Sequence, residues 1–324
     1  MKTSRIPELD GLRGMAILLV LGAHMGAGTA PANRHLFSFW NGGGGGLVGV
    51  QLFFVLSGYL ITGILLRELE TTKTVSFRNF YMRRVRRLYP ALLLMCVLIA
   101  AGWLIVTGSL RGIAADLVLA LTYTTNLSMF AYPIFHVHFH HIWLAHTWSL
   151  AVEEQFYLGW PILLVLAARR GGRARVTQLA LLGAAATIGA RFVLHVPADY
   201  MYKLMRWDAL LLGCALAAHP IRLPRALGWI GWAGIFAYFI MPERPITALD
   251  YTLTTFSCAL VVACAVDTSW LRNPVLRWFG TISYGLYLWH VFILRFGMHA
   301  TLSAAIAIAI STASYYLVER RFLR

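Results

Sequence analysis

The chain has few charged residues and very few acidic ones. Charged residues make up 13% of its 324 residues, with 13 aspartates and glutamates against 28 lysines and arginines. A soluble domain carries about 25% charged and about 45–50% apolar residues, whereas 59% of this chain is hydrophobic. The scarcity of charge excludes an ordinary soluble domain and indicates a polytopic membrane protein.

Several other features are absent. The four cysteines have no metal-ligand spacing and lie in apolar stretches (Cys96, Cys214, Cys258 and Cys264). No small-residue cleavage site follows the first apolar run, so we expect no cleaved signal peptide. We find neither a nucleotide-binding loop nor the internal repeat that many transporters carry. The length accommodates about ten spans of ~20 residues, so a single membrane domain over 1–324 is expected, with no appended soluble domain.

The basic residues are unevenly distributed along the chain. Apolar stretches occur at 13–31, 47–66, 88–107, 113–131, 148–167, 177–195, 206–218, 226–241, 249–266, 278–296 and 300–318. Stretch 113–131 contains the most polar residues, and counting it as a span would put the arginines of 169–175 outside. We therefore predict a re-entrant or interfacial helix within an external region at 108–147. Ten spans then remain, with 21 of the 28 basic residues and both termini on the cytoplasmic side.

Arg13 and His24 share one face of the first predicted span. Their eleven-residue separation corresponds to about three helical turns, or about 16 Å along the axis. An ionisable residue at mid-bilayer depth is costly and usually faces the protein interior at a pathway or reaction site. A histidine bonded to a neighbouring helix is the structural alternative, but imidazole is also the side chain best suited to proton transfer near neutral pH.

The third span is preceded by a dense basic segment. Four arginines, Arg83, Arg84, Arg86 and Arg87, fall within five residues. They could serve only as a topology signal and a contact for anionic lipid. Alternatively, they bind a phosphorylated ligand at the cytoplasmic face, because the guanidinium group matches phosphate oxygens.

Two further polar stripes occur in apolar surroundings. Ser149, Glu153 and Tyr157 repeat every four residues and so line one helix face. Helix capping explains part of that segment, but not the acidic residues next to apolar ones. Tyr284 and His290, with Tyr287 between them, form a second stripe.

Five histidines at 136–146 lack a nearby Asp, Glu or Cys, so we predict no metal site there.

Six segments, taken in order, resemble those of the acyltransferase family 3 membrane proteins, the O-acyltransferases of bacterial surface polysaccharides and natural products. They are Pro7–Arg13 leading to His24, Gly49–Leu60, Arg83–Pro90, Trp148–Tyr157, Ser283–His290 and Glu319–Arg320. Arg13 and His24 match the arginine–histidine motif of the family. The paired arginines of the family match either Arg83 and Arg86 or Arg84 and Arg87 in this chain. The larger members have a C-terminal esterase-like domain, which we do not expect here because the chain stops at Arg324.

The resemblance implies an enzyme of the bacterial inner (plasma) membrane. An acyl-CoA donor, with acetyl-CoA expected, would bind at the cytoplasmic face, and the acyl group would pass to a hydroxyl of a sugar, glycan or glycosylated natural product. It implies no bound cofactor, no metal and no nucleic-acid partner, and leaves the oligomeric state open. The residues expected at the substrate sites are Arg13, Ser57, Arg83, Arg84, Arg86, Arg87, Trp148, Ser149, Tyr157, Tyr284, Tyr287 and His290.

In the mechanism that we expect, His24 acts as general base on the acceptor hydroxyl or briefly carries the acyl group itself. Glu153 would orient the imidazole, as carboxylates do for catalytic histidines. The alternative is a transporter or flippase for an anionic lipid-linked sugar, with the same arginines as its binding site. A purely structural membrane partner would leave the buried His and Glu unexplained.

Overall fold

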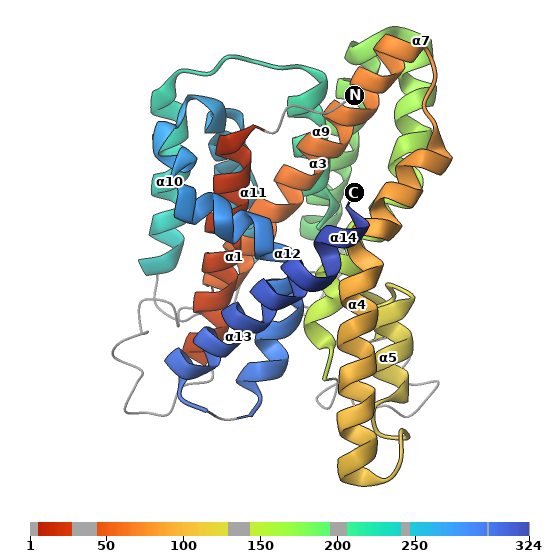
Figure 1. Ribbon diagram of the computed structural model, residues 1–324. Coiled ribbons are helices and arrows are strands. Elements are labelled where there is room, and N and C mark those ends of the chain that lie inside the picture. The colour runs from red at the N-terminus through yellow and green to blue at the C-terminus, as the bar shows by residue number, and fades with distance from the viewer. Residues whose placement is uncertain are drawn as a thin grey trace. The chain divides into compact units, whose positions relative to one another are not determined.

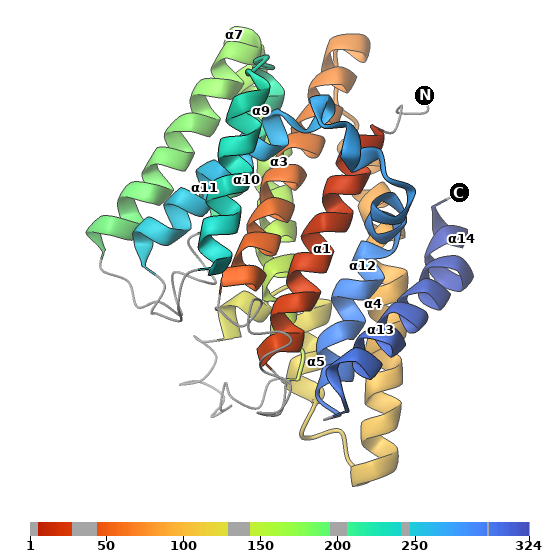
Figure 2. The ribbon, with the colours of Figure 1, turned by 90° about the vertical axis from the view of Figure 1, so that its left-hand side faces the viewer.

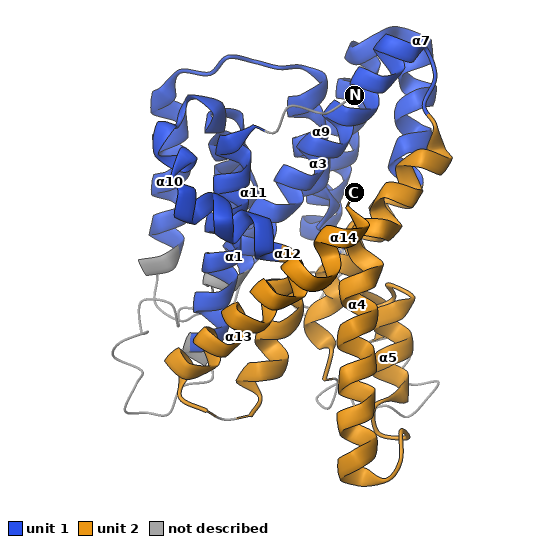
Figure 3. Ribbon diagram, viewed as in Figure 1, with its two compact units in different colours: residues 1–75, 159–283 blue, residues 76–158, 284–324 orange. Residues whose placement is uncertain are grey.

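The computed structural model describes residues 6–27, 44–128, 143–194, 206–240, 247–296 and 298–323. The secondary structure of these residues is entirely helical, which confirms the predicted all-α class. They form two compact units (Figure 3). Unit 1 comprises Met1–Val75 and Gly159–Ser283, and unit 2 comprises Ser76–Leu158 and Tyr284–Arg324.

Unit 1 is built around α1 and α3 (Figures 1 and 2). Its helices are α1 (Pro7–Ala27), α3 (Gly44–Thr72), the later part of α7 (Trp148–Val193), α9 (Trp207–Ala218), α10 (Arg225–Ile240), α11 (Ala248–Ala263) and the start of α12 (Pro274–Leu294). Helix α7 is interrupted at Gly171 and Gly172, where Gly172 has φ 61° and ψ −154°. A residue with a side chain rarely adopts that conformation, so glycine allows the chain to separate two helical arms there.

The helices of unit 1 approach one another backbone to backbone. A Cβ atom at Gly58 of α3 would lie 1.9 Å from Leu210 O of α9, and one at Gly213 would lie 2.0 Å from Val55 O. The same reciprocal contact joins Gly14 of α1 to the start of α12. In a membrane, apolar surface alone does not drive helices together, and small residues that permit close packing mark helix interfaces. Glycines therefore determine where α1, α3, α9 and α12 pack.

Unit 2 is built on α4 (Phe77–Thr107). It also contains α5 (Ala114–Leu121), the short helices η2 (Thr125–Leu127) and η4 (Ala145–Thr147), the first part of α7, the later part of α12, α13 (Ala300–Ser314), the π-helix η7 (Tyr315–Glu319) and α14 (Arg320–Phe322). Ser76 caps the start of α4 by accepting from Asn79 N, and Gly108 ends the helix in the left-handed conformation that glycine favours.

The segment after α4 turns back along that helix. Helix α5 has eight residues, or about 12 Å, which is too short to cross the hydrocarbon core. The Tyr89 hydroxyl of α4 donates to O of Leu121, the last residue of α5, at 3.1 Å. Tyr89 lies about 27 Å along the axis of α4 from the C-terminal end of that helix. Asp116 accepts from Trp143 N at 2.5 Å. Figure 1 shows α5 beside α4. The re-entrant or interfacial placement of this helix within 108–147 stays a prediction.

Four helical segments of the described residues are long and apolar enough to span a membrane. They are Leu47–Thr72, Phe77–Thr107, Ala145–Val193 and Ala300–Phe322. Helices α9 and α11 are apolar but shorter. In α4 the residues of the last turns are strongly exposed and apolar, with Ile105 and Val106 both 84% exposed, as expected for contact with lipid. The protein is therefore an integral membrane protein.

The glycine contacts lead to a stability prediction. Gly58→Ala should lower the stability of the detergent-solubilised protein by about 1–3 kcal/mol, because its new methyl group would overlap the Leu210 backbone. Gly63→Ala is the matched control on the same helix, since no atom lies within 4 Å of a Cβ there. Thermal unfolding followed by tryptophan fluorescence would measure both. Equal melting temperatures for the two variants would contradict the close packing of α3 and α9.

Candidate active site

Helix α1 carries Arg13 and His24, as the sequence predicted. It begins at Pro7 with Glu8 and Asp10 in its first turn, which suits the positive end of the helix dipole. Glu8 also accepts from Arg272 Nε at 2.5 Å. Because α1 is continuous from Pro7 to Ala27, Arg13 and His24 lie on one face of one helix, and both are half-buried.

The hydrogen bond of His24 selects one form of its ring. His24 Nδ1 lies 2.8 Å from Val20 O in the preceding turn. A carbonyl oxygen can only accept, so Nδ1 carries the proton of the neutral ring and Nε2 holds the lone pair. His24 is thus held in the tautomer whose Nε2 can act as a base. Ser57, also half-buried, lies in the same unit on α3, one residue before the contact that Gly58 makes with α9.

In unit 2 the basic segment of α4 contacts the acidic segment of α7. Arg84 Nη2 donates to Glu154 Oε1 at 2.6 Å, and its guanidinium group lies 3.5 Å from the centre of the Tyr157 ring. The Tyr157 hydroxyl donates to Glu153 Oε1 at 2.5 Å, one helical turn away. Tyr157 therefore joins the Arg84–Glu154 ion pair to Glu153.

The four predicted arginines differ in their surroundings. Arg84 and Arg87 are three residues apart and so share a helix face, and Arg87 lies within electrostatic range of Glu153 and Glu319. Arg83 and Arg86 are exposed to solvent, as Arg87 is. In the second of the two pairings left open by the sequence, both Arg84 and Arg87 are associated with carboxylates of unit 2.

A second polar cluster joins the start of α7 to α12. Ser149 and Tyr287 share a hydrogen bond of 2.6 Å between their hydroxyls, and Tyr287 donates to His146 O. His290 Nδ1 lies 2.8 Å from Tyr287 O, and the rings of His146 and His290 have centroids 5.8 Å apart. These side chains are buried. The predicted residues Ser149, Tyr287 and His290 therefore lie together, and His146 joins them.

The remaining predicted residues of unit 2 are also buried. The Tyr284 hydroxyl donates to Leu88 O of α4 at 2.8 Å, and Trp148 is 6% exposed at the first residue of α7. Glu319, at the end of the π-helix, is 4% exposed and accepts from Ser314 Oγ at 3.1 Å. His24 belongs to unit 1 and Glu153 to unit 2, so their pairing stays a prediction.

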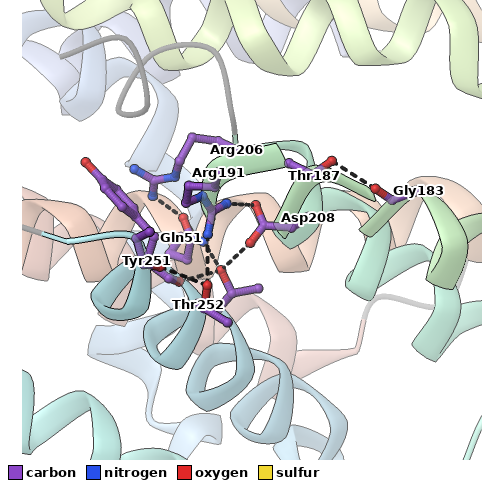
Figure 4. Close-up of polar contacts among 10 residues, drawn as sticks. Gln51, Gly183, Thr187, Arg191, Arg206, Asp208, Tyr251 and Thr252 are labelled. Carbon is purple, nitrogen blue, oxygen red and sulfur yellow. Dashed lines mark hydrogen bonds and ion pairs between the residues drawn. The ribbon is translucent and has the colours of Figure 1, made fainter. Parts of the chain in front are cut away.

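Sequence reasoning missed a buried polar network in unit 1 (Figure 4). Arg191 Nη2 donates to Asp208 Oδ1 at 2.7 Å, and both side chains are completely buried. Arg206, which lies on the external side in the ten-span topology, is also buried and donates to Gln51 Oε1. The ring of Tyr251 lies 5.0 Å from the Arg206 guanidinium carbon.

The signal for this network was present in the chain. Arg191 and Asp208 both lie in predicted spans, and the rule that singled out His24 applies equally to them. Their ion pair holds α7 against α9, and removing one partner of such a pair typically costs about 3–5 kcal/mol. The network stabilises unit 1, whereas the clusters of unit 2 contain most of the residues predicted at the substrate sites.

No group of three or more potential metal ligands occurs within the described ranges. The histidines at 136, 138, 140 and 141 lie outside them, so the expectation that they bind no metal stays a prediction.

The site and the fold define a helical membrane protein with a histidine on its first helix and an arginine–carboxylate cluster on α4 and α7. Residues 6–318 match a family model described as an acyltransferase domain, acyltransferase family 3. The chain belongs to this family, as the six sequence segments indicated.

Similar proteins occur in Bacillus subtilis and Listeria monocytogenes. The chain is 33% identical over 365 residues to "Putative peptidoglycan O-acetyltransferase YrhL" of Bacillus subtilis (strain 168), an alignment that covers 97% of the chain and 54% of that protein. It is 29% identical over 319 residues to "Peptidoglycan O-acetyltransferase OatA" of Listeria monocytogenes serovar 1/2a (strain ATCC BAA-679 / EGD-e), with 88% and 49% coverage. The chain spans about half the length of the curated relatives it matches. No solved structure matches it significantly.

Proposed function

We propose that this protein transfers an acetyl group from acetyl-CoA to a hydroxyl of a glycan. The observation that carries the proposal is the hydrogen bond to Val20 O, which leaves His24 Nε2 as the basic nitrogen of a half-buried ring. Membership of the acyltransferase family supports the reaction class. The names of the similar proteins support a glycan acceptor, with peptidoglycan the first to test.

In the proposed reaction the acceptor oxygen attacks the thioester carbonyl carbon while His24 Nε2 removes its proton. The carbon–sulfur bond then breaks, and the proton passes to the CoA sulfur. Alternatively, His24 attacks first and transfers the acyl group in a second step. Glu153 would orient the imidazole in either sequence.

For the donor, we propose that the arginines of α4 and Arg13 hold the phosphates and pantetheine arm of CoA. Arg83, Arg86 and Arg87 are exposed, so their guanidinium groups can reach phosphate oxygens. Arg84 is already bonded to Glu154, which leaves it a positioning role beside them. The remaining substrate contacts are assigned to Ser57, Trp148, Ser149, Tyr157, Tyr284, Tyr287 and His290.

The topology that we propose has ten spans in the bacterial inner membrane, with both termini cytoplasmic. Two of the spans are the arms of α7 on either side of Gly171 and Gly172, and α5 does not cross.

A membrane-impermeant thiol reagent tests this topology on intact cells. It should label Ser109→Cys from outside and leave Arg170→Cys unlabelled until the membrane is opened. The native cysteines are buried, so the unaltered protein provides the background. Labelling of Arg170→Cys in intact cells would mean that the re-entrant segment does cross.

His24→Gln should lower turnover by about 10²–10⁴-fold, because general acid–base groups contribute about that much. His219→Gln, at an exposed position after α9, is the matched control and should keep its turnover. The assay is release of CoA thiol by purified protein in liposomes with acetyl-CoA and peptidoglycan fragments. Near-normal turnover of folded His24→Gln would assign the histidine a structural role and reject the mechanism.

CoA binding should depend on the arginines of α4. Arg84→Ala with Arg87→Ala should weaken it, as should Arg87→Ala alone, which leaves the Arg84–Glu154 ion pair intact. Added salt should weaken binding to the unaltered protein as well. Isothermal titration with CoA and with dephospho-CoA measures the phosphate contribution, and Arg111→Ala, at an exposed position outside α4, is the control. Equal CoA affinity in all four proteins would place the donor site elsewhere.

A further inference from the structure

Two tryptophans from distant parts of the chain meet near the C-terminal end of α4, within unit 2. The rings of Trp103 and Trp143 have centroids 5.4 Å apart and pack edge to face. Phe292 of α12 continues the contact, with its ring centroid 6.5 Å from that of Trp143, and Phe296 packs on Phe292 at 5.2 Å. These four residues form one continuous set of rings, which we call the aromatic cluster.

The aromatic cluster reaches the surface of the protein. Phe296 is 62% exposed, and the other three rings are half-buried. The exposed side chain of Arg295 lies over the cluster, with its guanidinium carbon 4.9 Å from the centre of the Trp143 ring. A molecule in solution can therefore contact the rings and the guanidinium group without entering the protein interior.

A buried carboxylate holds Trp143 in place. Asp116 of α5 is 5% exposed and accepts from Trp143 N at 2.5 Å, and it also lies within hydrogen-bonding range of Leu144 N. Burial of a carboxylate is costly unless hydrogen bonds compensate it, so this contact fixes the backbone that carries the Trp143 ring. A ring that is ordered before binding loses less conformational freedom when a ligand arrives.

The surroundings of the aromatic cluster carry a surplus of positive charge. This end of unit 2 consists of the described ranges 108–128, 143–147, 291–296 and 298–299. Within those ranges Asp116 is the one carboxylate, and it is buried, whereas Arg111 and Arg295 are both exposed. Asp116 lies within electrostatic range of Arg295 and offsets part of its charge. The remaining positive charge complements a ligand that carries carboxylate groups.

The combination of rings and guanidinium group matches the chemistry of a sugar. The C–H groups of a pyranose ring pack on the face of an aromatic ring, and guanidinium N–H groups donate to carboxylate or hydroxyl oxygens. Tryptophan at a membrane interface is otherwise an anchor that contacts lipid. Here the tryptophan rings contact each other, and Arg295 lies over one of them, so a single ligand can meet both kinds of group.

We propose that the aromatic cluster and Arg295 bind the acceptor, a glycan that carries carboxylate groups. This rests on the proposed function and on the proposed topology, which puts the C-terminal end of α4 outside. Trp143 and Phe296 would pack on the sugar rings, and Arg295 would donate to a carboxylate. No bond is made or broken at this surface, which selects the acceptor chain and holds it.

The test measures acetyl transfer to peptidoglycan fragments by purified protein in nanodiscs of neutral lipid. Trp143→Ala should raise KM for the fragments about 3–10-fold, and Arg295→Gln about 10-fold, while kcat and KM for acetyl-CoA change little. Arg295 is exposed, so its variant remains informative if Trp143→Ala does not fold. Trp229→Ala is the matched control, because Trp229 is 63% exposed on α10 of unit 1. It should leave all three constants unchanged.

The charge of the ligand gives a second comparison. Neutral chito-oligosaccharides of matched length should bind the unaltered protein more weakly than peptidoglycan fragments do. Arg295→Gln should affect their binding less, because they have no carboxylate to lose as a partner. Isothermal titration without acetyl-CoA measures both ligands independently of turnover. An equal effect of Arg295→Gln on the two ligands would overturn the assignment of the carboxylate to Arg295.

Three further outcomes separate this inference from the proposed function. Turnover by the unaltered protein with unchanged glycan affinity in Trp143→Ala and Arg295→Gln would overturn this inference alone. So would variants that alter only the melting temperature, and only in nanodiscs containing phosphatidylglycerol, because the cluster would then be a lipid anchor. An unaltered protein that neither binds the fragments nor turns over acetyl-CoA would overturn both.

Discussion

The structure depends on one constraint, which is that charged and polar side chains at membrane depth must find partners within the protein. Hydrocarbon offers no hydrogen bonds, so each such group is either paired or costly. Arg191 and Asp208 satisfy the constraint in unit 1, and Arg84 and Glu154 do so in unit 2.

The two units meet the constraint differently. In unit 1, glycines such as Gly58 bring helix backbones into contact, and this packing positions α1 with Arg13 and His24. In unit 2, side-chain hydrogen bonds carry more of the organisation, since the segment between α5 and η2 has irregular backbone whose polar groups need partners such as Gln155.

The arginine-rich segment of α4 illustrates how pairing separates roles. All four arginines appear equivalent as a charge run, yet Arg84 is held by Glu154 and Tyr157 while Arg86 is exposed. A guanidinium group already bonded to a carboxylate is less available to phosphate than an exposed one. We therefore expect the exposed arginines of α4 to contact the phosphates of the CoA donor and Arg84 to position them.

The sequence by itself determined the helical membrane class, the family and the face shared by Arg13 and His24, because hydropathy and helical period are local properties. Charge asymmetry also predicted a re-entrant or interfacial helix within 108–147, and that placement stays a prediction. Only the tertiary structure decided that Arg84 pairs with Glu154 and that Arg206 is buried against Gln51. Those outcomes depend on contacts between helices far apart in the chain, such as α3 with α9, and no local pattern encodes which polar groups will meet.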